Sequence, residues 1–166
     1  KELKTDQCLK LIDQMAQAGT RHIKFTGGEP VVRKDLPKLL ERAHTLGLKT
    51  SLNSNGTLIP QKLDQLRTLS AVSLSLDGPP AIHDLHRGKG QTEEVLAACR
   101  SLKGADIAIT LQCLVTSRTT HACVDYVLDV AQEFAAKATF QPALDIELGT
   151  TNPNPVAPNA AHVRRL

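Results

Sequence analysis

This chain of 166 residues has few aromatic side chains: it contains three Phe, one Tyr and no Trp. Its core must therefore be aliphatic, and it offers few aromatic faces on which nucleobases could stack. The chain also lacks blocks of lysine and arginine, since its net charge of +3 comes from 20 basic and 17 acidic residues spread along the sequence. Together these absences argue against nucleic acid as a partner.

Long hydrophobic runs are absent as well. No stretch is apolar for long enough to cross a bilayer, and no N-terminal segment resembles a signal peptide. We therefore expect a cytoplasmic protein that does not contact membranes. A chain of this length forms one domain and buries a core without help from disulfides or metals. Its first residue is Lys rather than Met, and residues 161–166 look like an interrupted helix, so we expect a fragment of a longer protein.

Closely spaced cysteines are also missing. The four cysteines are scattered, with no two closer than ten positions: Cys8, Cys99, Cys113 and Cys123. Metal and cluster sites need several ligands that converge on one point, and this spacing provides no such motif. Each cysteine instead falls on the apolar stripe of an expected helix or strand, where it packs like a small hydrophobic residue. We therefore predict that all four are structural and reduced, and that none binds metal.

Apolar residues recur at helical and at strand spacing in regular alternation, which is the pattern of βα units around a parallel sheet. Thr5 and Asp35 are candidate N-caps of the first two helices. A loop of about 14 residues is expected between residues 77 and 92, and it is longer than packing alone needs. We predict helices near residues 5–18, 35–46, 60–69, 92–102 and 120–136, and strands near residues 22–26, 48–53, 71–77, 107–115 and 138–141.

Polar residues occupy one face of the expected strands. In the strand near residues 71–77, Ser73, Ser75 and Asp77 share one face, and apolar residues form the other. A sheet covered by helices on both sides would be apolar on both faces. The pattern therefore predicts a curved sheet with helices outside and a concave lumen inside, as in a full or partial barrel. In the alternative interpretation, small hydroxyl side chains only fill a tight barrel core.

Glycine and polar residues gather at the carboxyl ends of the strands, where parallel βα sheets carry their sites. In the turn Gly27-Gly28-Glu29-Pro30, the glycines let the backbone approach a ligand closely. Glu29 supplies acceptor oxygens for a cation, and Pro30 stiffens the exit from the turn. The alternative is a tight strand-to-helix loop without a ligand. Four segments therefore meet at the rim formed by the carboxyl ends of the strands. They are this turn, Asn53, Ser75 with Asp77, and Gln112.

Several motifs together resemble one known family. They are Thr26-Gly27-Gly28-Glu29-Pro30, Asn53-Ser-Asn-Gly-Thr57, and Ser73-Leu-Ser-Leu-Asp-Gly78 followed by His83-Asp84 and Arg87-Gly88. They look like the motifs of radical S-adenosylmethionine (radical SAM) enzymes. The similarity points to the branch with molybdenum-cofactor, pyrroloquinoline-quinone (PQQ) and heme-modifying members and SPASM-type peptide-modifying enzymes. It covers nearly the whole chain and implies an α/β fold, a partial (β/α)6 TIM-like barrel whose first strand and cluster loop are missing here.

On this resemblance, residues 1–150 would be a truncated barrel core, and residues 151–166 a proline-rich linker with the start of a helix. The turn Gly27–Pro30 would bind the amino group of S-adenosylmethionine, with Glu29 and backbone carbonyls as acceptors. Ser75 and Arg87 would hold its ribose and carboxylate, since a guanidinium pairs well with a carboxylate. The complete set of implied cofactor-binding residues is Gly27, Gly28, Glu29, Pro30, Asn53, Ser75, Asp77, Arg87 and Gln112.

Other members of this set have less defined roles. Asn53 and Gln112 would bond the carboxylate, the ribose or the substrate. Asp77 is either a ligand contact or the residue that caps the turn after it. The nearby His83 and His86 are candidate acids or bases, or else solvated loop side chains.

The family's cluster motif is missing from the chain. Radical SAM enzymes hold a [4Fe-4S] cluster on three cysteines spaced CxxxCxxC, and we expect these cysteines upstream of Lys1. The resemblance implies cleavage of S-adenosylmethionine to methionine and a 5'-deoxyadenosyl radical that abstracts a substrate hydrogen. It also implies an electron donor such as a flavodoxin or ferredoxin, and a peptide or small-molecule substrate such as a cofactor precursor. The fragment alone is expected to be inactive.

Two alternatives to a radical SAM core remain. One is a (β/α) barrel enzyme of another class whose Gly27-Gly28 backbone cradles a phosphate, although Glu29 would repel that anion. The other is a non-catalytic barrel module that serves as a binding partner.

Overall fold

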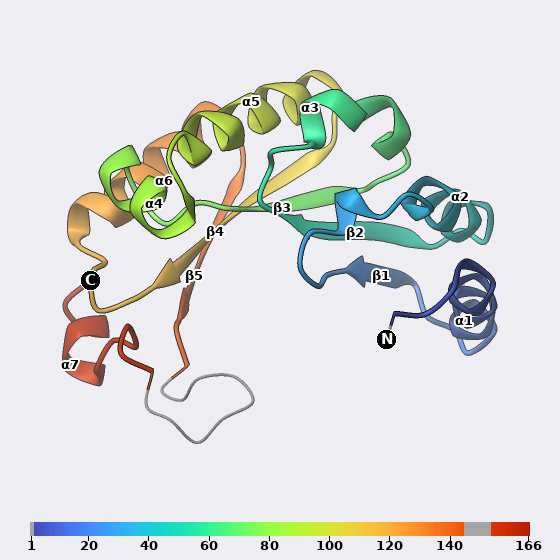
Figure 1. The fold of residues 1–166 in the computed structure, drawn as a ribbon, viewed down its shortest axis with the longest axis horizontal. Coiled ribbons are helices and arrows are strands. Elements are labelled where there is room, and N and C mark those ends of the chain that lie inside the picture. Colours follow the sequence, from blue (N-terminus) through green and yellow to red (C-terminus); the bar gives the residue numbers. More distant parts are fainter. Residues whose placement is uncertain (1, 145–153) are drawn as a thin grey trace.

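The computed structural model describes residues 2–144 and 154–166, and it contains one parallel sheet with helices packed on its outer side (Figure 1). Each neighbouring pair of strands is parallel. This order arises when each strand leads through a helical crossover to the next strand, and it confirms the predicted α/β class. The strands follow chain order across the sheet: β1 (His22–Phe25), β2 (Lys49–Ser54), β3 (Ala71–Ser75), β4 (Ala108–Val115) and β5 (Lys137–Pro142).

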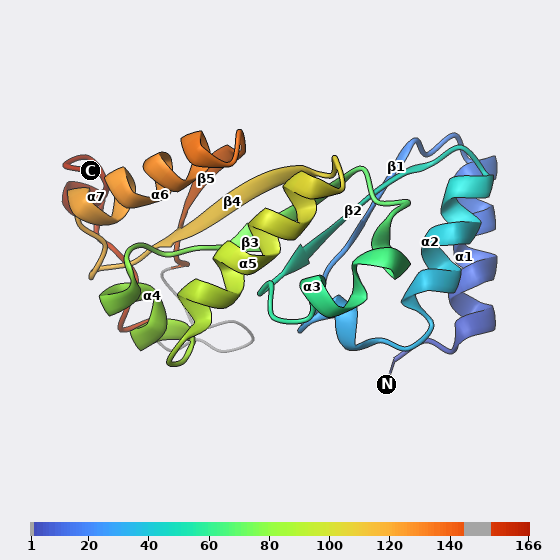
Figure 2. The ribbon, with the colours of Figure 1, turned by 90° about the horizontal axis from the view of Figure 1, so that it is seen from above.

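The helices lie in the segments before, between and after the strands. Figures 1 and 2 show α3, α5 and α6 on the convex side of the sheet, and α1 beside α2 near β1. The sheet is therefore a partial barrel that is open on its concave side. The helices are α1 (Thr5–Gln17), α2 (Leu36–Thr45), α3 (Ile59–Lys62), α4 (Pro80–Arg87), α5 (Gln91–Gly104), α6 (His121–Glu133) and α7 (Ala160–Val163), with 3-10 turns η1 (Pro30–Val32) and η2 (Leu63–Leu66).

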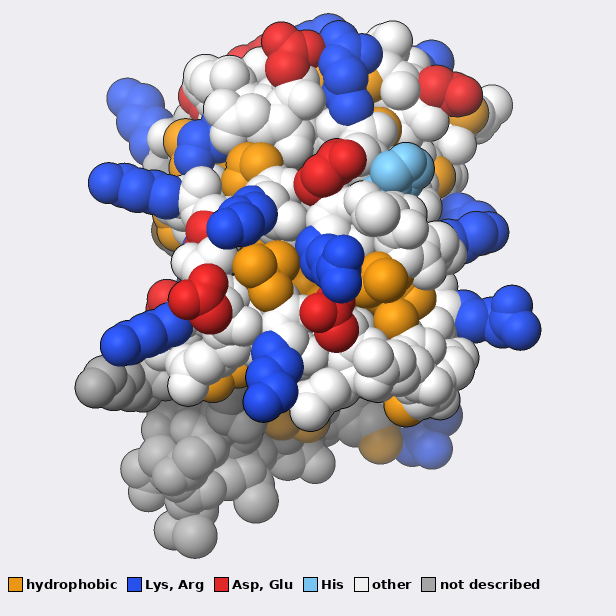
Figure 3. Space-filling view, turned by 90° about the vertical axis from the view of Figure 1, so that its right-hand side faces the viewer, with side chains coloured by type: hydrophobic (Ala, Val, Ile, Leu, Met, Phe, Trp, Pro, Cys, Tyr) orange, Lys and Arg blue, Asp and Glu red, His pale blue; other side chains and the backbone are white. Residues whose placement is uncertain are grey.

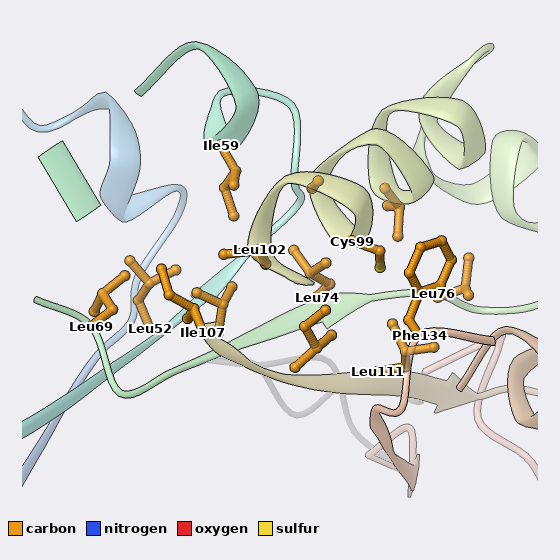
Figure 4. Packing of buried hydrophobic residues seen from close by; sticks show 14 of the residues in the cluster. Leu52, Ile59, Leu69, Leu74, Leu76, Cys99, Leu102, Ile107, Leu111 and Phe134 are labelled. Carbon is orange, nitrogen blue, oxygen red and sulfur yellow. The ribbon is translucent and has the colours of Figure 1, made fainter. Parts of the chain in front are cut away.

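The main core lies between the outer face of the sheet and the helices. Leu74 of β3 and Leu111 of β4 are fully buried there, together with Leu102 of α5 (Figure 4). Burial of each such side chain contributes about 1.5–3 kcal/mol. A second cluster joins α1 and α2 to β1 and contains Ile12, Ile23, Leu39, Ala43 and Leu48. The core is aliphatic, as the composition predicts, and it holds the strand ends in fixed positions.

The inner face of the sheet carries the alternate set of strand residues. Leu52 and Val72, which are paired in the register, point outward and are buried beneath the helices. Because successive strand residues point to opposite faces, the residues that alternate with them, and their partners in the register, point inward. Most inner residues are polar, which confirms the predicted separation of polar and apolar faces. The inner positions are His22, Lys24, Lys49, Ser51, Asn53, Ala71, Ser73, Ser75, Ala108, Thr110, Gln112, Leu114, Lys137, Thr139 and Gln141.

The segment after β3 differs from its prediction. The strand expected over residues 71–77 ends at Ser75, and the expected loop before residue 92 contains helix α4. Pro80 occupies the first turn of α4, where its fixed φ suits a helix, and Gly88 ends the helix with φ +115°. The sequence pattern missed this helix because its eight residues are too few to establish a helical period. As a result, α4 carries Arg87 to the rim of the sheet.

The two predicted N-caps bond to side chains rather than to helix backbone. Lys4 is the N-cap residue of α1, while Thr5 Oγ1 donates to Asp35 Oδ2 at 2.6 Å. Asp35 does occupy the N-cap position of α2, but its carboxylate accepts from Arg33 Nη2 at 2.8 Å. The hydrogen bonds from Arg33 and Thr5 hold the pKa of Asp35 below its usual value. These bonds connect the start of α1 to the start of α2.

The C-terminal segment lies beside the loop that follows β4. The backbone N–H of Ser117 donates to the carbonyl of Val156 at 2.9 Å, and α7 follows. Residues 151–153 of the predicted proline-rich linker lie outside the described residues, so the division at residue 150 stays a prediction. Within the described residues, no helix has the length and apolar character needed to cross a membrane.

Candidate functional site

A cavity of about 270 Å³ opens at the carboxyl ends of the strands. It contains six of the nine predicted cofactor-binding residues: Gly27, Gly28, Asn53, Ser75, Arg87 and Gln112. Thr26, Ser54, Asn55 and Leu114 complete the lining. Folding therefore brings the loop after β1 together with β2, β3, β4 and α4 around one space. We call this space the rim cavity.

The turn after β1 presents its backbone to the rim cavity. Gly27 has φ +142°, a conformation that side-chain-bearing residues rarely adopt, and nothing lies within 4 Å of the position of an added Cβ. The glycine is thus needed for the backbone conformation, and the space in front of it is open. Carbonyl oxygens of such a turn can accept hydrogen bonds from a cationic ligand.

Glu29 connects the turn to the loop after β2. Its carboxylate accepts from the backbone N–H of Asn55 at 2.8 Å, from Ser54 Oγ at 3.0 Å and from the N–H of Val31 at 3.1 Å. Glu29 and Pro30 line a neighbouring apolar groove of about 690 Å³ rather than the rim cavity. Glu29 therefore positions the two loops, and the predicted direct contact of its side chain with a ligand stays a prediction.

Asn53 offers an unused acceptor. Its Oδ1 is buried and has no hydrogen-bond partner among the described residues, although Asn53 lines the rim cavity. Leaving a buried acceptor unpaired costs about 1–3 kcal/mol. A ligand that donates a hydrogen bond would remove this cost. Gln112, on the opposite side, donates from Nε2 to Gln141 Oε1 at 2.9 Å, which orients its amide.

Arg87 is held at the rim by Asp77. Nε of Arg87 donates to Asp77 Oδ2 at 2.8 Å and Nη2 donates to Oδ1 at 3.3 Å, while the N–H of Leu114 also donates to Oδ1 at 3.0 Å. Asp77 is only 2% exposed. Burial acts to raise its pKa, but the hydrogen bond and charge of Arg87 outweigh it, so the pKa of Asp77 lies below its usual value. Asp77 is ionised at neutral pH and fixes the guanidinium.

This geometry bears on the two roles predicted for Asp77. Its carboxylate bonds Arg87 and Leu114, so it positions Arg87 instead of capping the next turn. That turn is tight for another reason: a Cβ added at Gly78 would lie 2.9 Å from the Cβ of Cys123 on α6. Arg87 itself keeps part of its guanidinium accessible, since its side chain is 35% exposed. The site thus presents a fixed cation to the rim cavity.

The two candidate histidines lie on α4 and differ in exposure. His83 is 1% exposed, and its Nδ1 accepts from the backbone N–H of Asp77 at 3.1 Å. Burial lowers the pKa of His83, so its ring is neutral at neutral pH. The prediction of a solvated loop residue is therefore wrong for His83, because this part of the loop is helix α4, whose His83 side chain is buried against the backbone of Asp77 just after β3. His86 Nδ1 lies 3.8 Å from Asp77 Oδ2, and His86 lines a second cavity of about 280 Å³ beside Arg87.

The four cysteines do not come together. All are free; Cys99, Cys113 and Cys123 are buried, whereas Cys8 is half-buried. Burial raises the pKa of both Cys99 and Cys113 to about 12, so these thiols stay protonated and are poor metal ligands at neutral pH. No group of three or more His, Cys, Asp or Glu side chains within residues 2–144 and 154–166 is arranged to hold a metal ion.

Sequence reasoning missed some residues of the rim cavity. Thr26 and Asn55 belong to the quoted motifs, but they were not assigned to the site. Leu114 was missed because it is an apolar residue on a mostly polar face, two positions after Gln112. The signal that could have found Leu114 is the alternation in β4: Thr110 and Gln112 point inward, and Leu114 is the next residue of the same series.

The sequence matches a known family and known relatives. The family model "Radical SAM superfamily" matches residues 1–131. An AdoMet-dependent heme synthase from Oleidesulfovibrio alaskensis is 39% identical over 120 residues, which cover 69% of this chain and 31% of that protein. A PqqA peptide cyclase from Granulibacter bethesdensis is 31% identical over 147 residues, covering 83% of this chain and 38% of that protein. The chain thus spans well under half the length of these relatives.

The fold also matches a solved structure. SuiB from Streptococcus suis, bound to S-adenosylmethionine, superposes with a TM-score of 0.80 over 99% of this chain and 39% of that chain. The two sequences are 17% identical, so this match supports the fold and not the activity.

Proposed function

This chain belongs to the radical SAM superfamily, and from that premise we propose that it forms the S-adenosylmethionine-binding part of an enzyme that cleaves this cofactor reductively. Membership implies S-adenosylmethionine and a [4Fe-4S] cluster as cofactors. The rim cavity is our proposed cofactor site, because it combines a backbone turn, an unpaired buried acceptor and a fixed guanidinium.

Each side of the rim cavity suits a different group of the cofactor. The carbonyls of the Gly27–Pro30 turn accept from the ammonium group, while Glu29 keeps the turn in place. Arg87 donates to the carboxylate, and Asp77 prevents its guanidinium from turning away. Asn53 Oδ1 accepts from the ammonium or a ribose hydroxyl. The open hydroxyl of Ser75 and the amide of Gln112 contact the ribose.

The cluster does not fit the residues of this chain. The four cysteines of this chain are far apart in sequence, and three of them are buried as packed side chains. We therefore derive no role for them in cluster binding. We propose that the cluster ligands are supplied outside residues 1–166. S-adenosylmethionine held in the rim cavity would, on receiving one electron, supply methionine and a 5'-deoxyadenosyl radical able to abstract a hydrogen atom. A flavodoxin or ferredoxin is our proposed electron donor.

The substrate is proposed from the relatives. The named relatives are a heme synthase and a peptide cyclase. We propose a peptide or a small cofactor precursor, bound on the concave face next to the rim cavity. The chain's own part in the reaction is to orient the cofactor and to exclude water around it.

The observation that carries this proposal is that Asn53, whose Oδ1 is buried without a partner in the described part of the chain, lines the same cavity as Arg87. Titration calorimetry of the chain with S-adenosylmethionine tests it. We expect binding that Arg87→Gln weakens by about tenfold or more, because a charge-assisted hydrogen bond contributes about 1.5–3 kcal/mol. The matched control is Arg100→Gln, since Arg100 lies on the exposed face of α5 and pairs with Glu93.

Competing ligands separate this function from its rivals. S-adenosylhomocysteine keeps the ammonium, carboxylate and ribose, so it should compete with S-adenosylmethionine. Glycerol 3-phosphate should not compete, because it lacks these groups. Competition by glycerol 3-phosphate alone, or equal affinity of the Arg87 and Arg100 variants, would contradict the proposed site.

A further inference from the structure

Among the described residues, the inner strand positions of the concave face carry basic side chains and no acidic ones. Lys24 of β1, Lys49 of β2 and Lys137 of β5 are exposed there, and no Asp or Glu occupies an inner position of the five described strands. The outer surface over α1 and α2 differs, because it interleaves basic and acidic side chains (Figure 3). With 20 basic and 17 acidic residues in the chain, composition alone does not explain an inner face of one sign.

The basic charge is densest on β1 and β2. His22 lies opposite Lys49 in the strand register, and Lys24 lies opposite Ser51. Neighbouring strands are about 4.8 Å apart, and alternate residues of a strand are about 6.6 Å apart, so these four side chains form one patch. We call them the basic patch. His22 Nε2 and Ser51 Oγ lie 2.8 Å apart, which places both polar groups on the inner face.

No acidic side chain neutralises the basic patch within the described residues. Lys24 and Lys49 form no salt bridge there. At the rim, Asp77 is paired with Arg87, and Glu29 accepts hydrogen bonds from the loop after β2. Lys24 and Lys49 are diagonal neighbours on the two strands, because Lys24 lies opposite Ser51 and Lys49 opposite His22, so their charges repel across a short distance without being directly opposite. A bound anion would offset this repulsion.

The basic patch lies directly below the rim cavity. Lys24 and Ser51 each precede by two residues a residue that lines that cavity: Thr26, directly after β1, and Asn53, on the same face of β2. Since a strand rises about 3.3 Å per residue, the patch begins about 7 Å deeper in the concave face. A molecule anchored on the patch would extend its remaining atoms toward the rim cavity.

We propose that the basic patch binds an anionic group of the substrate, a carboxylate or a phosphate. This inference rests on the proposed function, which places the cofactor at the rim and leaves the deeper concave face to the substrate. Lysine ammonium groups bind such anions as point charges with three donors each, and the Ser51 hydroxyl adds a directional donor. Lys137 on the opposite edge strand extends the positive potential across the concave face. The substrate class is therefore anionic.

Two simple anions probe the basic patch in the 166-residue chain. Titration calorimetry at low salt with pyrophosphate and with citrate compares phosphate and carboxylate chemistry. The test variant is Lys24→Gln with Lys49→Gln. The matched control is Lys10→Gln with Lys38→Gln, which removes the same charge from exposed positions of α1 and α2. Circular dichroism melting shows whether each variant is folded.

We expect at least one probe to bind, and we expect the patch variant to lose about tenfold or more in affinity while the control changes less than about twofold. The tighter probe identifies the anion chemistry. Equal losses in the two variants, or no binding of either probe to the unmodified chain, would overturn the proposal, because the charge effect would then be non-specific or absent.

Titration of the same proteins with S-adenosylmethionine separates this inference from the proposed function. We expect the patch variant to keep its affinity for S-adenosylmethionine. If the unmodified chain binds a probe through Lys24 and Lys49 but does not bind S-adenosylmethionine, the proposed function fails and the anion site stands. If it binds S-adenosylmethionine while the patch variant binds the probes as tightly as the unmodified chain does, only the anion site fails.

Discussion

The two sides of the rim cavity are built from different chemistry. On the β1–β2 side, backbone and a neutral amide face the cavity, namely Gly27, Gly28 and Asn53 with its unpaired Oδ1. On the β3–β4 side, a buried carboxylate fixes a guanidinium, Asp77 with Arg87. One side accepts hydrogen bonds and the other donates them. A ligand with an ammonium and a carboxylate on the same carbon matches both sides.

The two sides also differ in how strongly they are coupled to folding. Asp77 connects α4 to the backbone of β4 through Arg87 and the N–H of Leu114. Asn53 Oδ1, in contrast, has no partner in the described part of the chain. Substitutions on the donor side should therefore change both stability and binding, whereas substitutions of Asn53 should change binding alone.

The largest expected effect is that of Asp77→Ala. It leaves Arg87 without its partner and the N–H of Leu114 without its acceptor, and we expect a loss of about 3 kcal/mol in the free energy of unfolding. Urea denaturation measures this loss. The control is Asp64→Ala, because Asp64 and Arg67 form an exposed pair worth about 1 kcal/mol or less. Similar losses in both variants would show that Asp77 is not specially coupled to the fold.

The second largest effect is expected for Glu29→Gln, which tests the β1–β2 side of the rim cavity. The amide keeps the shape of the side chain but replaces one acceptor oxygen, so Asn55 N–H or Ser54 Oγ loses a charged partner. We expect a loss of about 1–2 kcal/mol in unfolding free energy, together with weaker S-adenosylmethionine binding. Unchanged stability would mean that Glu29 does not hold the two loops together.

Asn53→Ala separates binding from stability most clearly. Because it removes an unpaired buried acceptor, we expect the unfolding free energy to stay within about 0.5 kcal/mol of the original chain or to rise. Its affinity for S-adenosylmethionine should nevertheless fall by about tenfold. A destabilised variant with normal affinity would contradict the role of Asn53 as a ligand acceptor.

The smallest expected effect concerns pH and His83. Burial holds the folded-state pKa of His83 below its ordinary value of 6.5, so the unfolded chain binds this proton more readily. Stability should therefore fall as the pH drops below that value. Urea denaturation from about pH 7 to about pH 5 should show a smaller fall for His83→Gln than for the original chain. Identical pH slopes would contradict a neutral buried His83.

Much of this architecture could be predicted from the sequence. The family resemblance and the partial barrel are confirmed, and alternate polar residues such as Ser73 and Ser75 do lie on the inner face. Loops at the ends of parallel strands must meet at one edge, so parity and topology were enough to bring Asn53, Ser75 and Gln112 together.

The parts that escaped prediction depend on contacts between distant residues. Helix α4 is too short for its period to be read, although it places Arg87 and His83 around Asp77. The loop-joining role of Glu29 depends on the positions of Ser54 and Asn55, which only the pairing of β1 with β2 defines. The inner strand positions carry basic and no acidic side chains, and this could be recognised only from the strand register. Lysines on separate strands show no pattern along the sequence.

A crystal structure of this chain with S-adenosylmethionine tests the central claim most directly. The account predicts the cofactor in the rim cavity, with its carboxylate within hydrogen-bond distance of the Arg87 guanidinium and its ammonium on the carbonyls of the Gly27-Gly28 turn. Density for the cofactor elsewhere, or with its carboxylate on the turn and its ammonium beside Arg87, would contradict it.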